Sequence, residues 1–472
     1  MAWAGVVGVG TELKMDKQTL VPDQLSKHQH KQSNKMGSKN SSCPPTAVSS
    51  TSSIPDLKGS KNSSCPPTAV SSTSSIPDLK NAKESKVVED IKKAIENKNF
   101  SLAASILQKY LEDENNIPLN IAVTGQSGVG KSTFINAFRG IDDTDERAAP
   151  TGEVETTMKP KAYPHPTYPN VALWDLPGIG TPRYPAVQYM KLVEFEKFDF
   201  FILVSDTRFN ENDAKLAKEI TKMGKKLYFV HSKIDSSLNA ASRRQKEYDE
   251  EKKLQEIREY CIQGLKGQGV ASPQVFLVSS FDLHLYEFRA LQDTMERELP
   301  SHKRDVLILA LPNICKSTID KKKEVFHSKI WLYALLSATV AAIPIAGISI
   351  VFDVGILVKV IRDYLLGFGL DKRSLEKCSS ATNTPLDELM AMLNCFCSGK
   401  DVTKEVIIFM LKSATLILTS LAAEEGSRLI PLIGIPIAAA LSFTIIYMFL
   451  ESNLNELSVD AENIVTKALT IK

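Results

Sequence analysis

Eight consecutive residues, from Gly125 to Ser132, have the types and spacing of a phosphate-binding loop. They read Gly-Gln-Ser-Gly-Val-Gly-Lys-Ser and fit the pattern G-x-x-x-x-G-K-[ST]. Glycines let backbone N–H groups turn inward around phosphate oxygens, and a helix that begins here adds the positive end of its dipole. We therefore expect Lys131 to reach the terminal phosphates of a nucleotide and the Ser132 hydroxyl to bind Mg²⁺.

The sequence on both sides of this loop is the context that the motif requires. An apolar run at 121–124 precedes it as a buried strand, and 132–138 follow with helical spacing. A glycine-rich loop that only turns the chain is the alternative, which this context disfavours. The predicted nucleotide-binding residues of the loop are Gly125, Gln126, Ser127, Gly128, Val129, Gly130, Lys131, Ser132 and Thr133.

Two further motifs follow and identify the nucleotide. Asp175-Leu-Pro-Gly178 fits D-x-x-G, in which the carboxylate holds Mg²⁺ through water and the Gly178 N–H meets the γ-phosphate. Ser232-Lys-Ile-Asp235 fits [NTS]-K-x-D, in which the carboxylate accepts hydrogen bonds from the N1–H and the exocyclic amine of guanine. Because adenine presents neither donor on that edge, the motif predicts GTP rather than ATP.

Other residues complete the predicted base site. The stem of Lys233 would pack over the base plane, and Ser279 and Ser280 follow a strand at the point where a backbone N–H and a hydroxyl can approach the base carbonyl. Each of these short motifs is weak alone. They are strong together because each lies at the carboxyl end of a strand, where open α/β sheets bind ligands.

A hydroxyl between the phosphate loop and Asp175 should complete the Mg²⁺ shell. Thr156 and Thr157 are the candidates, and either could fold onto the γ-phosphate and release after hydrolysis. Ordinary strand threonines are the alternative, since threonine favours strands in any case.

The elements that must position these residues alternate as in a mostly parallel sheet, which predicts an α/β nucleotide-binding domain over residues 117–285. The proline-rich segment 163–170 is predicted to be a turn after an edge strand, and 243–263 a charged helix with a solvated face. The predicted strands are 121–124, 171–175, 200–204, 227–230 and 274–278.

Helical patterns lie on both sides of this region. Residues 85–116 predict two amphipathic helices that break near 97–99, and residues 286–472 predict a helical domain. The uncharged runs 331–352 and 429–450 are long enough to cross a bilayer. Because each contains proline and glycine, two shorter helices joined by a tight turn are an equally supported interpretation.

Residues 1–84 predict a disordered, Ser- and Pro-rich tail. Within it the 22-residue segment Gly37–Lys58 recurs unchanged at Gly59–Lys80. Two identical polar copies cannot bury a face against each other, so we interpret them as a duplication rather than a solenoid. A short linear binding motif is the alternative.

The overall composition excludes some classes of protein. The 472 residues carry a net charge of +2, which gives no support to nucleic acid as a partner. The seven cysteines are scattered, and Cys395 and Cys397 are too close for an ordinary zinc knuckle, so reduced thiols in a cytosolic protein are expected. The N-terminus lacks the pattern of a signal peptide, and Ala2 does not fit N-myristoylation.

Several of these motifs resemble those of the interferon-inducible, immunity-related GTPases. They are the phosphate loop extended to Asn136, Val-Glu-Thr-Thr-Met at 154–158, Leu-Trp-Asp-Leu-Pro-Gly-Ile-Gly at 173–180 and Leu-Pro-Asn-Ile at 311–314. The resemblance runs from about residue 85 to the C-terminus. It implies a Ras-like domain joined to an all-α domain formed by segments on both sides of it.

The resemblance also implies a function. Members hydrolyse GTP with Mg²⁺, self-assemble or assemble with related GTPases in the GTP state, and act on intracellular or pathogen-vacuole membranes in cell-autonomous immunity. It implies a cytoplasmic protein with peripheral membrane association, and it identifies Thr157 as the switch threonine. Lys131 is typical of the effector branch, because regulatory members carry methionine there. Ile179 stands where small GTPases place the glutamine that orients water, so hydrolysis must be organised differently.

The sequence leaves three functional hypotheses: an active, self-assembling GTPase, a GTP-loaded regulator with little turnover, and an integral membrane protein with a GTP-binding head. For catalysis we single out Lys131, Thr157 and Gly178, and as metal ligands Ser132, Thr157 and Asp175. Arg139, Arg147 and Arg183 lie near the expected switches and could contact phosphate, although surface solvation is the default. His231 is interpreted as a strand-end histidine rather than a catalytic base.

Overall fold

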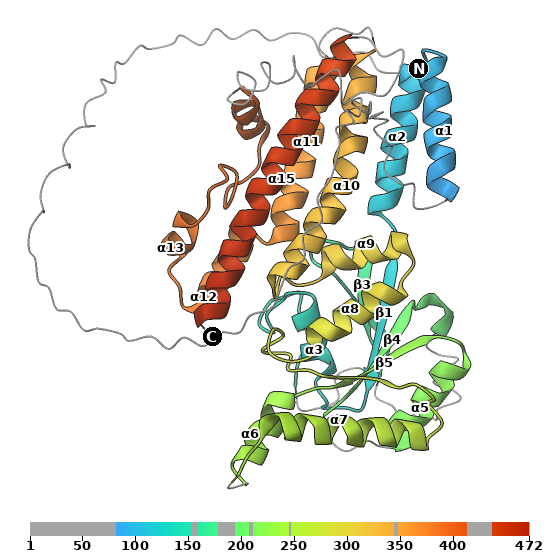
Figure 1. Cartoon of the computed structure of the whole chain (residues 1–472), viewed down its shortest axis with the longest axis vertical. Coiled ribbons are helices and arrows are strands. Elements are labelled where there is room, and N and C mark those ends of the chain that lie inside the picture. Colours follow the sequence, from blue (N-terminus) through green and yellow to red (C-terminus); the bar gives the residue numbers. More distant parts are fainter. Residues whose placement is uncertain are drawn as a thin grey trace, which may run out of the picture. The chain divides into compact units, whose positions relative to one another are not determined.

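The computed structural model of this chain describes residues 82–152, 159–177, 194–206, 211–244, 247–343, 348–412 and 437–471. These residues belong to one compact unit and combine a sheet flanked by helices with a set of long helices (Figure 1). The predicted tail and its repeat lie outside the described residues up to position 81.

A sheet with the strand order β2-β3-β1-β4-β5-β6 carries the loops of interest. β2 pairs antiparallel with β3 at one edge, and the other neighbouring strands pair in parallel. This arrangement confirms the predicted α/β class and the edge strand, with slightly different strand ends. The strands are β1 (Leu119–Gly125), β2 (Lys161–Pro164), β3 (Val171–Asp175), β4 (Phe200–Ser205), β5 (Lys226–His231) and β6 (Gln274–Leu277).

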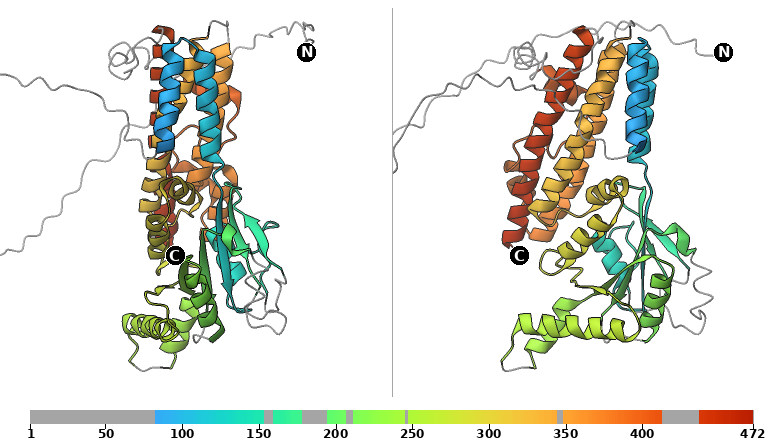
Figure 2. Two further views of the ribbon diagram at one scale, coloured as in Figure 1. Left: turned by 90° about the vertical axis from the view of Figure 1, so that its right-hand side faces the viewer. Right: turned by 45° about the vertical axis from the view of Figure 1, so that its right-hand side comes forward.

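The continuous apolar runs of the central strands arise because both faces of the sheet are buried. On β4, Ile202 packs into one core and its neighbour Leu203 into the other. The first core also receives side chains of α3 (Lys131–Phe138), α8 (Phe288–Glu298) and α9 (Ser301–Ala310). The second receives side chains of α5 (Glu211–Lys222), α6 (Ile234–Ser242) and α7 (Glu250–Gly267), so helices cover each face (Figure 2).

The charged helix predicted at 243–263 begins later than expected. α6 ends at Ser242, and α7 begins at Glu250, where the Asp249 side chain accepts a 3.1 Å hydrogen bond from the N–H of Lys252. An aspartate at this position satisfies one of the free N–H groups of the first turn, which fixes the start of the helix. The prediction missed this cap and was wrong about the N-terminal boundary.

The two amphipathic helices expected near the start of the described chain are confirmed. α1 (Ala82–Glu96) and α2 (Phe100–Asn115) are separated by a short turn in which Lys98 has φ +56°. The Asn99 side chain accepts a 3.1 Å hydrogen bond from the N–H of Leu102 and caps α2.

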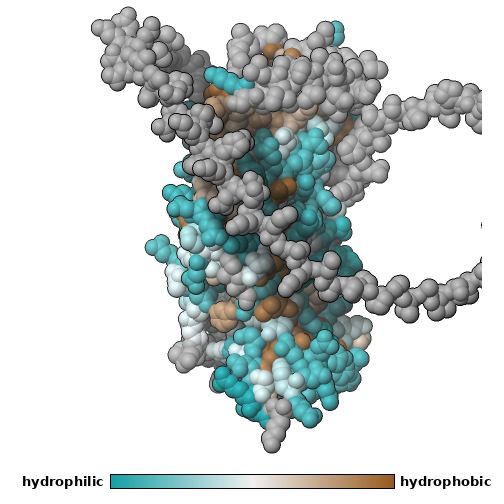
Figure 3. Space-filling view, turned by 60° about the vertical axis from the view of Figure 1, so that its left-hand side comes forward, coloured by the Kyte–Doolittle hydropathy of each residue, from teal (hydrophilic) through white to brown (hydrophobic). Residues whose placement is uncertain are grey.

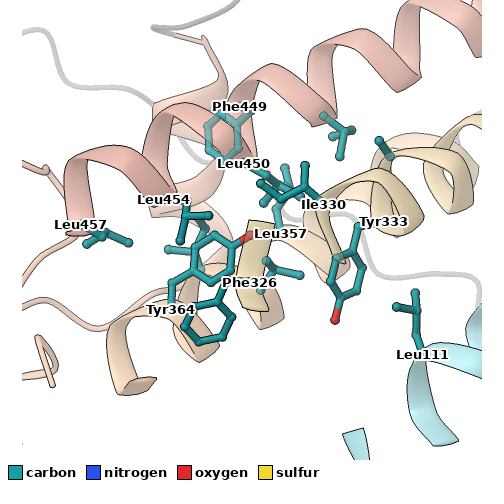
Figure 4. Close-up of a cluster of buried hydrophobic side chains, with 14 of the residues drawn as sticks. Leu111, Phe326, Ile330, Tyr333, Leu357, Tyr364, Phe449, Leu450, Leu454 and Leu457 are labelled. Atoms are coloured by element: carbon teal, nitrogen blue, oxygen red, sulfur yellow. The ribbon is translucent and has the colours of Figure 1, made fainter. Parts of the chain in front are cut away.

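A third core joins these helices to the long helices of the C-terminal half. Figure 4 shows Phe326 and Ile330 of α10 (Lys316–Ala341), with Tyr364 of α11 (Ile348–Phe368) and Leu454 of α15 (Ile437–Ile471), packed together. The shorter helices α12 (Lys372–Thr382) and α13 (Leu386–Ala391) contribute Leu375 and Leu389.

The first of the two apolar runs is divided between helices. α10 ends at Ala341 and α11 begins at Ile348, and the Pro344–Gly347 segment between them lies outside the described residues. The residues that interrupt the second run, Pro431, Gly434 and Pro436, also lie outside the described residues. Among the residues that the structure describes, no helix is both long and apolar enough to cross a membrane.

Hydrophilic residues predominate on the described part of the face in Figure 3, with hydrophobic groups scattered between them. Exposed large hydrophobic side chains include Phe281 and Phe409, at 70% and 56% exposure. Phe409 packs against the half-exposed ring of Phe396, with the ring centroids 5.2 Å apart.

Candidate functional site

The loop between β1 and α3 has the backbone shape of a phosphate cradle. Gly125 has φ +140°, and a Cβ at this position would overlap the carbonyl oxygen of Val204 on the neighbouring strand β4. Gly130, at φ +91°, immediately precedes α3. Glycine alone adopts such conformations without strain, so the glycines allow the chain to reverse directly from a buried strand into a helix.

Two side chains at the start of α3 lie where the motif requires them. Lys131 is largely buried, and its Nζ donates a 2.7 Å hydrogen bond to the carbonyl of Gln126 within the same loop. The Ser132 hydroxyl donates a 3.2 Å hydrogen bond to Oδ2 of Asp175 at the end of β3. The structure therefore brings two of the three predicted metal ligands together.

The predicted base-recognition motif contacts the phosphate loop directly. The Ser232 hydroxyl donates a 2.6 Å hydrogen bond to the Val129 carbonyl, and Lys233 Nζ donates a 2.7 Å hydrogen bond to that of Gly128. Lys233 has φ +55° and directly precedes α6, so its side chain returns toward the loop. The two motifs thus form one continuous site.

Asp235 has an unsatisfied carboxylate oxygen. Its Oδ1 is buried and has no hydrogen-bond partner among the described residues, while Oδ2 accepts a 3.3 Å hydrogen bond from the Ser236 hydroxyl. Buried polar atoms are nearly always paired, so this oxygen is available to a ligand donor. Ser279, which follows β6 closely in the sequence, is fully buried, and its hydroxyl accepts a 3.3 Å hydrogen bond from the N–H of Asp282. Ser280 is half-buried.

Some predicted site residues cannot be placed. Thr156, Thr157, Gly178, Ile179 and Arg183 lie outside the described residues, so the roles expected of them stay predictions.

Two residues that the sequence analysis missed support the site. Asp206, just after β4, accepts a 2.6 Å hydrogen bond from Lys233 Nζ, which also donates to the Gly128 carbonyl of the loop. Asn136 of α3 donates to the Ala149 carbonyl and accepts from the Ala149 N–H, at 2.9 and 2.7 Å. The position of Asp206 at the carboxyl end of a strand was the signal that could have identified it.

The default interpretation of Arg139 as a solvated surface residue was wrong. Its side chain is 4% exposed, and it donates to the carbonyls of Pro164 and Arg147, so burial lowers its pKa from the ordinary arginine value. His231 ends β5 as predicted, and burial lowers its pKa as well. Arg147 pairs with Asp145 at 3.1 Å instead of standing free in solvent.

Asp145 also connects this loop to the C-terminal helices. Its Oδ2 lies 3.1 Å from the guanidinium of Arg373 and 3.3 Å from Lys377 Nζ, both on α12. Hydrogen bonds from Arg147 hold the pKa of Asp145 well below its usual value. The loop that leads into the predicted switch threonines is therefore tied to the helical part of the chain by an ion-pair cluster.

A mostly parallel sheet with a phosphate loop after β1, an acidic residue at the end of β3 and a base-recognition motif after β5 defines a guanine-nucleotide-binding P-loop protein. Residues 84–465 match the family model described as Interferon-inducible GTPase (IIGP). This chain therefore belongs to the interferon-inducible GTPase family, and it is a GTPase.

Individual relatives agree with this assignment. The chain is 38% identical over 386 residues to Interferon-inducible GTPase 5 of Bos taurus, a match that covers 81% of this chain and 82% of the relative. It is 41% identical over 312 residues to Interferon-gamma-inducible GTPase 10 of Mus musculus, covering 65% and 75% respectively. T-cell-specific guanine nucleotide triphosphate-binding protein 2 of Mus musculus is 41% identical over 318 residues, covering 66% and 76%.

Proposed function

We propose that this chain binds GTP across the carboxyl ends of β1, β3, β5 and β6 and hydrolyses it to GDP and phosphate. The observation that carries the choice of base is the buried, unpartnered Oδ1 of Asp235. Guanine offers two adjacent donors, N1–H and the exocyclic amine, that would satisfy this carboxylate. Each hydrogen bond to a charged group contributes about 1.5–3 kcal/mol, so adenine, which lacks these donors, would bind far more weakly.

The phosphates would lie on the N–H groups of 125–133, with Lys131 released from the Gln126 carbonyl to reach them. Mg²⁺ prefers oxygen ligands, and the hydroxyl and carboxylate that meet at Ser132 and Asp175 fit that preference. The ion would neutralise charge between the β- and γ-phosphates. Thr157 would supply a further ligand and Gly178 an N–H to the γ-phosphate. Because Ile179 cannot orient water, a group outside these motifs must do so.

We further propose that the GTP state self-assembles, or assembles with related GTPases, and acts peripherally on intracellular or pathogen-vacuole membranes in cell-autonomous innate immunity. Family membership supports a role in interferon-inducible immunity. The retained Lys131 supports an active enzyme over a low-turnover regulator. GTP turnover measured across a series of protein concentrations separates these two: self-activated hydrolysis rises faster than linearly, and a regulator stays slow throughout.

Replacing Asp235 by Asn tests the site itself. Xanthine carries a carbonyl where guanine carries the amine, so an amide with one acceptor and one donor matches xanthosine triphosphate. We expect Asp235→Asn to weaken GTP binding by roughly 10- to 100-fold and to strengthen binding of xanthosine triphosphate. Asp249→Asn, at the cap of α7, is the matched control. If Asp235→Asn left the preference for GTP intact, the proposed base site would be wrong.

A further inference from the structure

Two thiols lie against each other beneath a surface turn of the helical part of the chain. The Sγ atoms of Cys395 and Cys397 are 3.1 Å apart, and both side chains are buried, at 4% and 0% exposure. Phe396 between them is 46% exposed, and Asn394 is exposed as well. The two thiols are therefore buried in a turn whose neighbouring residues reach the solvent.

A buried carboxylate holds the backbone of this turn in place. Asp460 of α15 is fully buried and accepts hydrogen bonds from Asn394 N–H, Cys395 N–H and the Ser398 hydroxyl at 2.8, 3.0 and 2.8 Å. The Ser398 N–H also donates to the Cys395 carbonyl at 3.1 Å. Because these bonds fix the backbone on both sides of the thiols, the short separation of the sulfurs is built into the turn.

The two thiols are not equivalent. A hydrogen bond from Cys397 lowers the pKa of Cys395, and that same hydrogen bond, together with burial, raises the pKa of Cys397. Of the two sulfurs, Cys395 is therefore the one that loses its proton more readily. Because the thiolate is the reactive form of cysteine, Cys395 is the sulfur expected to react first.

We propose that Cys395 and Cys397 form a reversible disulfide when a hydroperoxide is present, with Cys395 oxidised first. In the first step the Cys395 sulfur attacks one oxygen of hydrogen peroxide, and the O–O bond breaks to give a sulfenic acid and one water. In the second step the Cys397 sulfur attacks the Cys395 sulfur, and the S–O bond breaks to release a second water. Two thiols lose two electrons and two protons to one peroxide.

The spacing of the pair explains why the bond would be reversible. Closing it requires the sulfurs to approach from 3.1 Å to about 2.0 Å across a ring that contains a single intervening residue. Disulfides in strained geometries have higher reduction potentials and are readily reduced by thiols. The dithiol would therefore be the resting form under reducing conditions, and the disulfide a transient modified form.

Mass spectrometry of the full chain tests the first part of this proposal. The native protein is exposed to hydrogen peroxide, the remaining thiols are alkylated in denaturant, and the cysteine-containing peptides are analysed. We expect a peptide with an internal disulfide between Cys395 and Cys397, and we expect dithiothreitol to restore both thiols. This disulfide should form about tenfold or more faster than the half-buried Cys378 is oxidised, because burial raises the pKa of Cys378. Oxidation of the pair no faster than Cys378, or only after unfolding, would overturn it.

Single substitutions test the order of the two steps. In Cys397→Ser the sulfenic acid at Cys395 cannot be resolved, so dimedone should label Cys395 when the peroxide is removed and the protein is then unfolded in its presence. In Cys395→Ser, Cys397 should remain unlabelled over the same period. If Cys397 in Cys395→Ser were labelled as fast as Cys395 in Cys397→Ser, the proposal that Cys395 is oxidised first would be wrong. Circular dichroism checks that both variants are folded, and the wild-type peptide result decides the first part independently of them.

Discussion

The hydroxyl of Ser232 donates a 2.6 Å hydrogen bond to the carbonyl of Val129. This contact joins two motifs that are 103 positions apart in the sequence and that we expect to bind opposite ends of one nucleotide. Both atoms are buried, so neither has water as an alternative partner. The contact fixes the distance between the phosphate loop and the base-recognition motif.

Ser232→Ala should weaken nucleotide binding without unfolding the protein. The substitution leaves the Val129 carbonyl without this donor and loosens the loop, which we expect to cost about 1–2 kcal/mol, or roughly 5- to 30-fold in affinity. Titration with a fluorescent guanine nucleotide measures the change. Ser242→Ala, at an exposed residue that ends α6, the helix following Ser232, is the control. An unchanged affinity in Ser232→Ala would contradict the link.

Two glycines of the phosphate loop should differ in their tolerance of alanine. At Gly125 a methyl group overlaps the backbone oxygen of Val204, whereas at Gly128 no atom of the described residues, its two chain neighbours aside, lies within 4 Å of the added Cβ. Gly128→Ala therefore carries only the strain of its φ of +80°, about 1 kcal/mol, and Gly125→Ala must also displace β4. Thermal unfolding compares them, and equal losses would contradict the reasoning.

Asp145→Asn should destabilise the protein at neutral pH and matter less in acid. Its partners Arg147, Arg373 and Lys377 are partly exposed, so we expect a loss of about 1–2 kcal/mol in total. Because the folded pKa is lowered from 3.8, the contribution is complete above that value and is lost as the pH falls below it. Urea unfolding from pH 7 down to 3 measures the difference between wild type and variant.

A double-mutant cycle assigns part of this effect to the contact with α12. If Arg373→Ala and Asp145→Asn are coupled, the double variant loses less stability than the sum of the two. Strict additivity, or a difference between wild type and Asp145→Asn that is unchanged at pH 3, would exclude the ion pair as the cause.

Lys322 should make stability rise with pH. Its ammonium is buried in the helical core and donates a 2.8 Å hydrogen bond to the Gly367 carbonyl, and burial lowers its pKa from 10.5 to about 7. The unfolded chain binds the extra proton between these values, so the free energy of unfolding increases from pH 7 toward 10.5, by up to about 1.4 kcal/mol per pH unit.

Lys322→Met removes this titration. Relative to wild type, the variant should gain stability near pH 7 and lose the gain by pH 9.5, as measured by chemical unfolding. Lys323→Met, at a neighbour that keeps contact with solvent, should show no such trend. Parallel pH profiles for wild type and Lys322→Met would show that the buried ammonium is not the cause.

The sequence was sufficient for the parts of the site that local backbone chemistry determines. The glycines of the phosphate loop, the acidic end of β3 and Asp235 each follow from a short motif next to a strand, because the strand's carboxyl end places the motif. The same reasoning located the β-strands, since an apolar run buried on both faces has few other interpretations.

Contacts between distant segments could not be predicted in this way. Lys233 pairs with Asp206 only because β4 and β5 are neighbours, and Arg373 reaches Asp145 across 228 positions. Arg139 was misinterpreted for the same reason. Nothing near it in the sequence shows that its guanidinium donates a hydrogen bond to the carbonyl of Pro164. Whether a charged side chain is buried depends on which elements pack against it in the fold, and the composition of the sequence does not reveal that packing.

Helix α9 has a side chain in each of two cores: Leu307 packs with the sheet, and Ile308 packs with the long helices. Phe288 of α8 also covers the sheet. A fragment ending at residue 285, where the nucleotide-binding domain was predicted to end, would keep α3 on that face of the sheet but would expose the apolar residues that α8 and α9 cover. We expect such a fragment to aggregate, and a fragment extended through Ala310 to be the shortest one worth isolating as a nucleotide-binding unit.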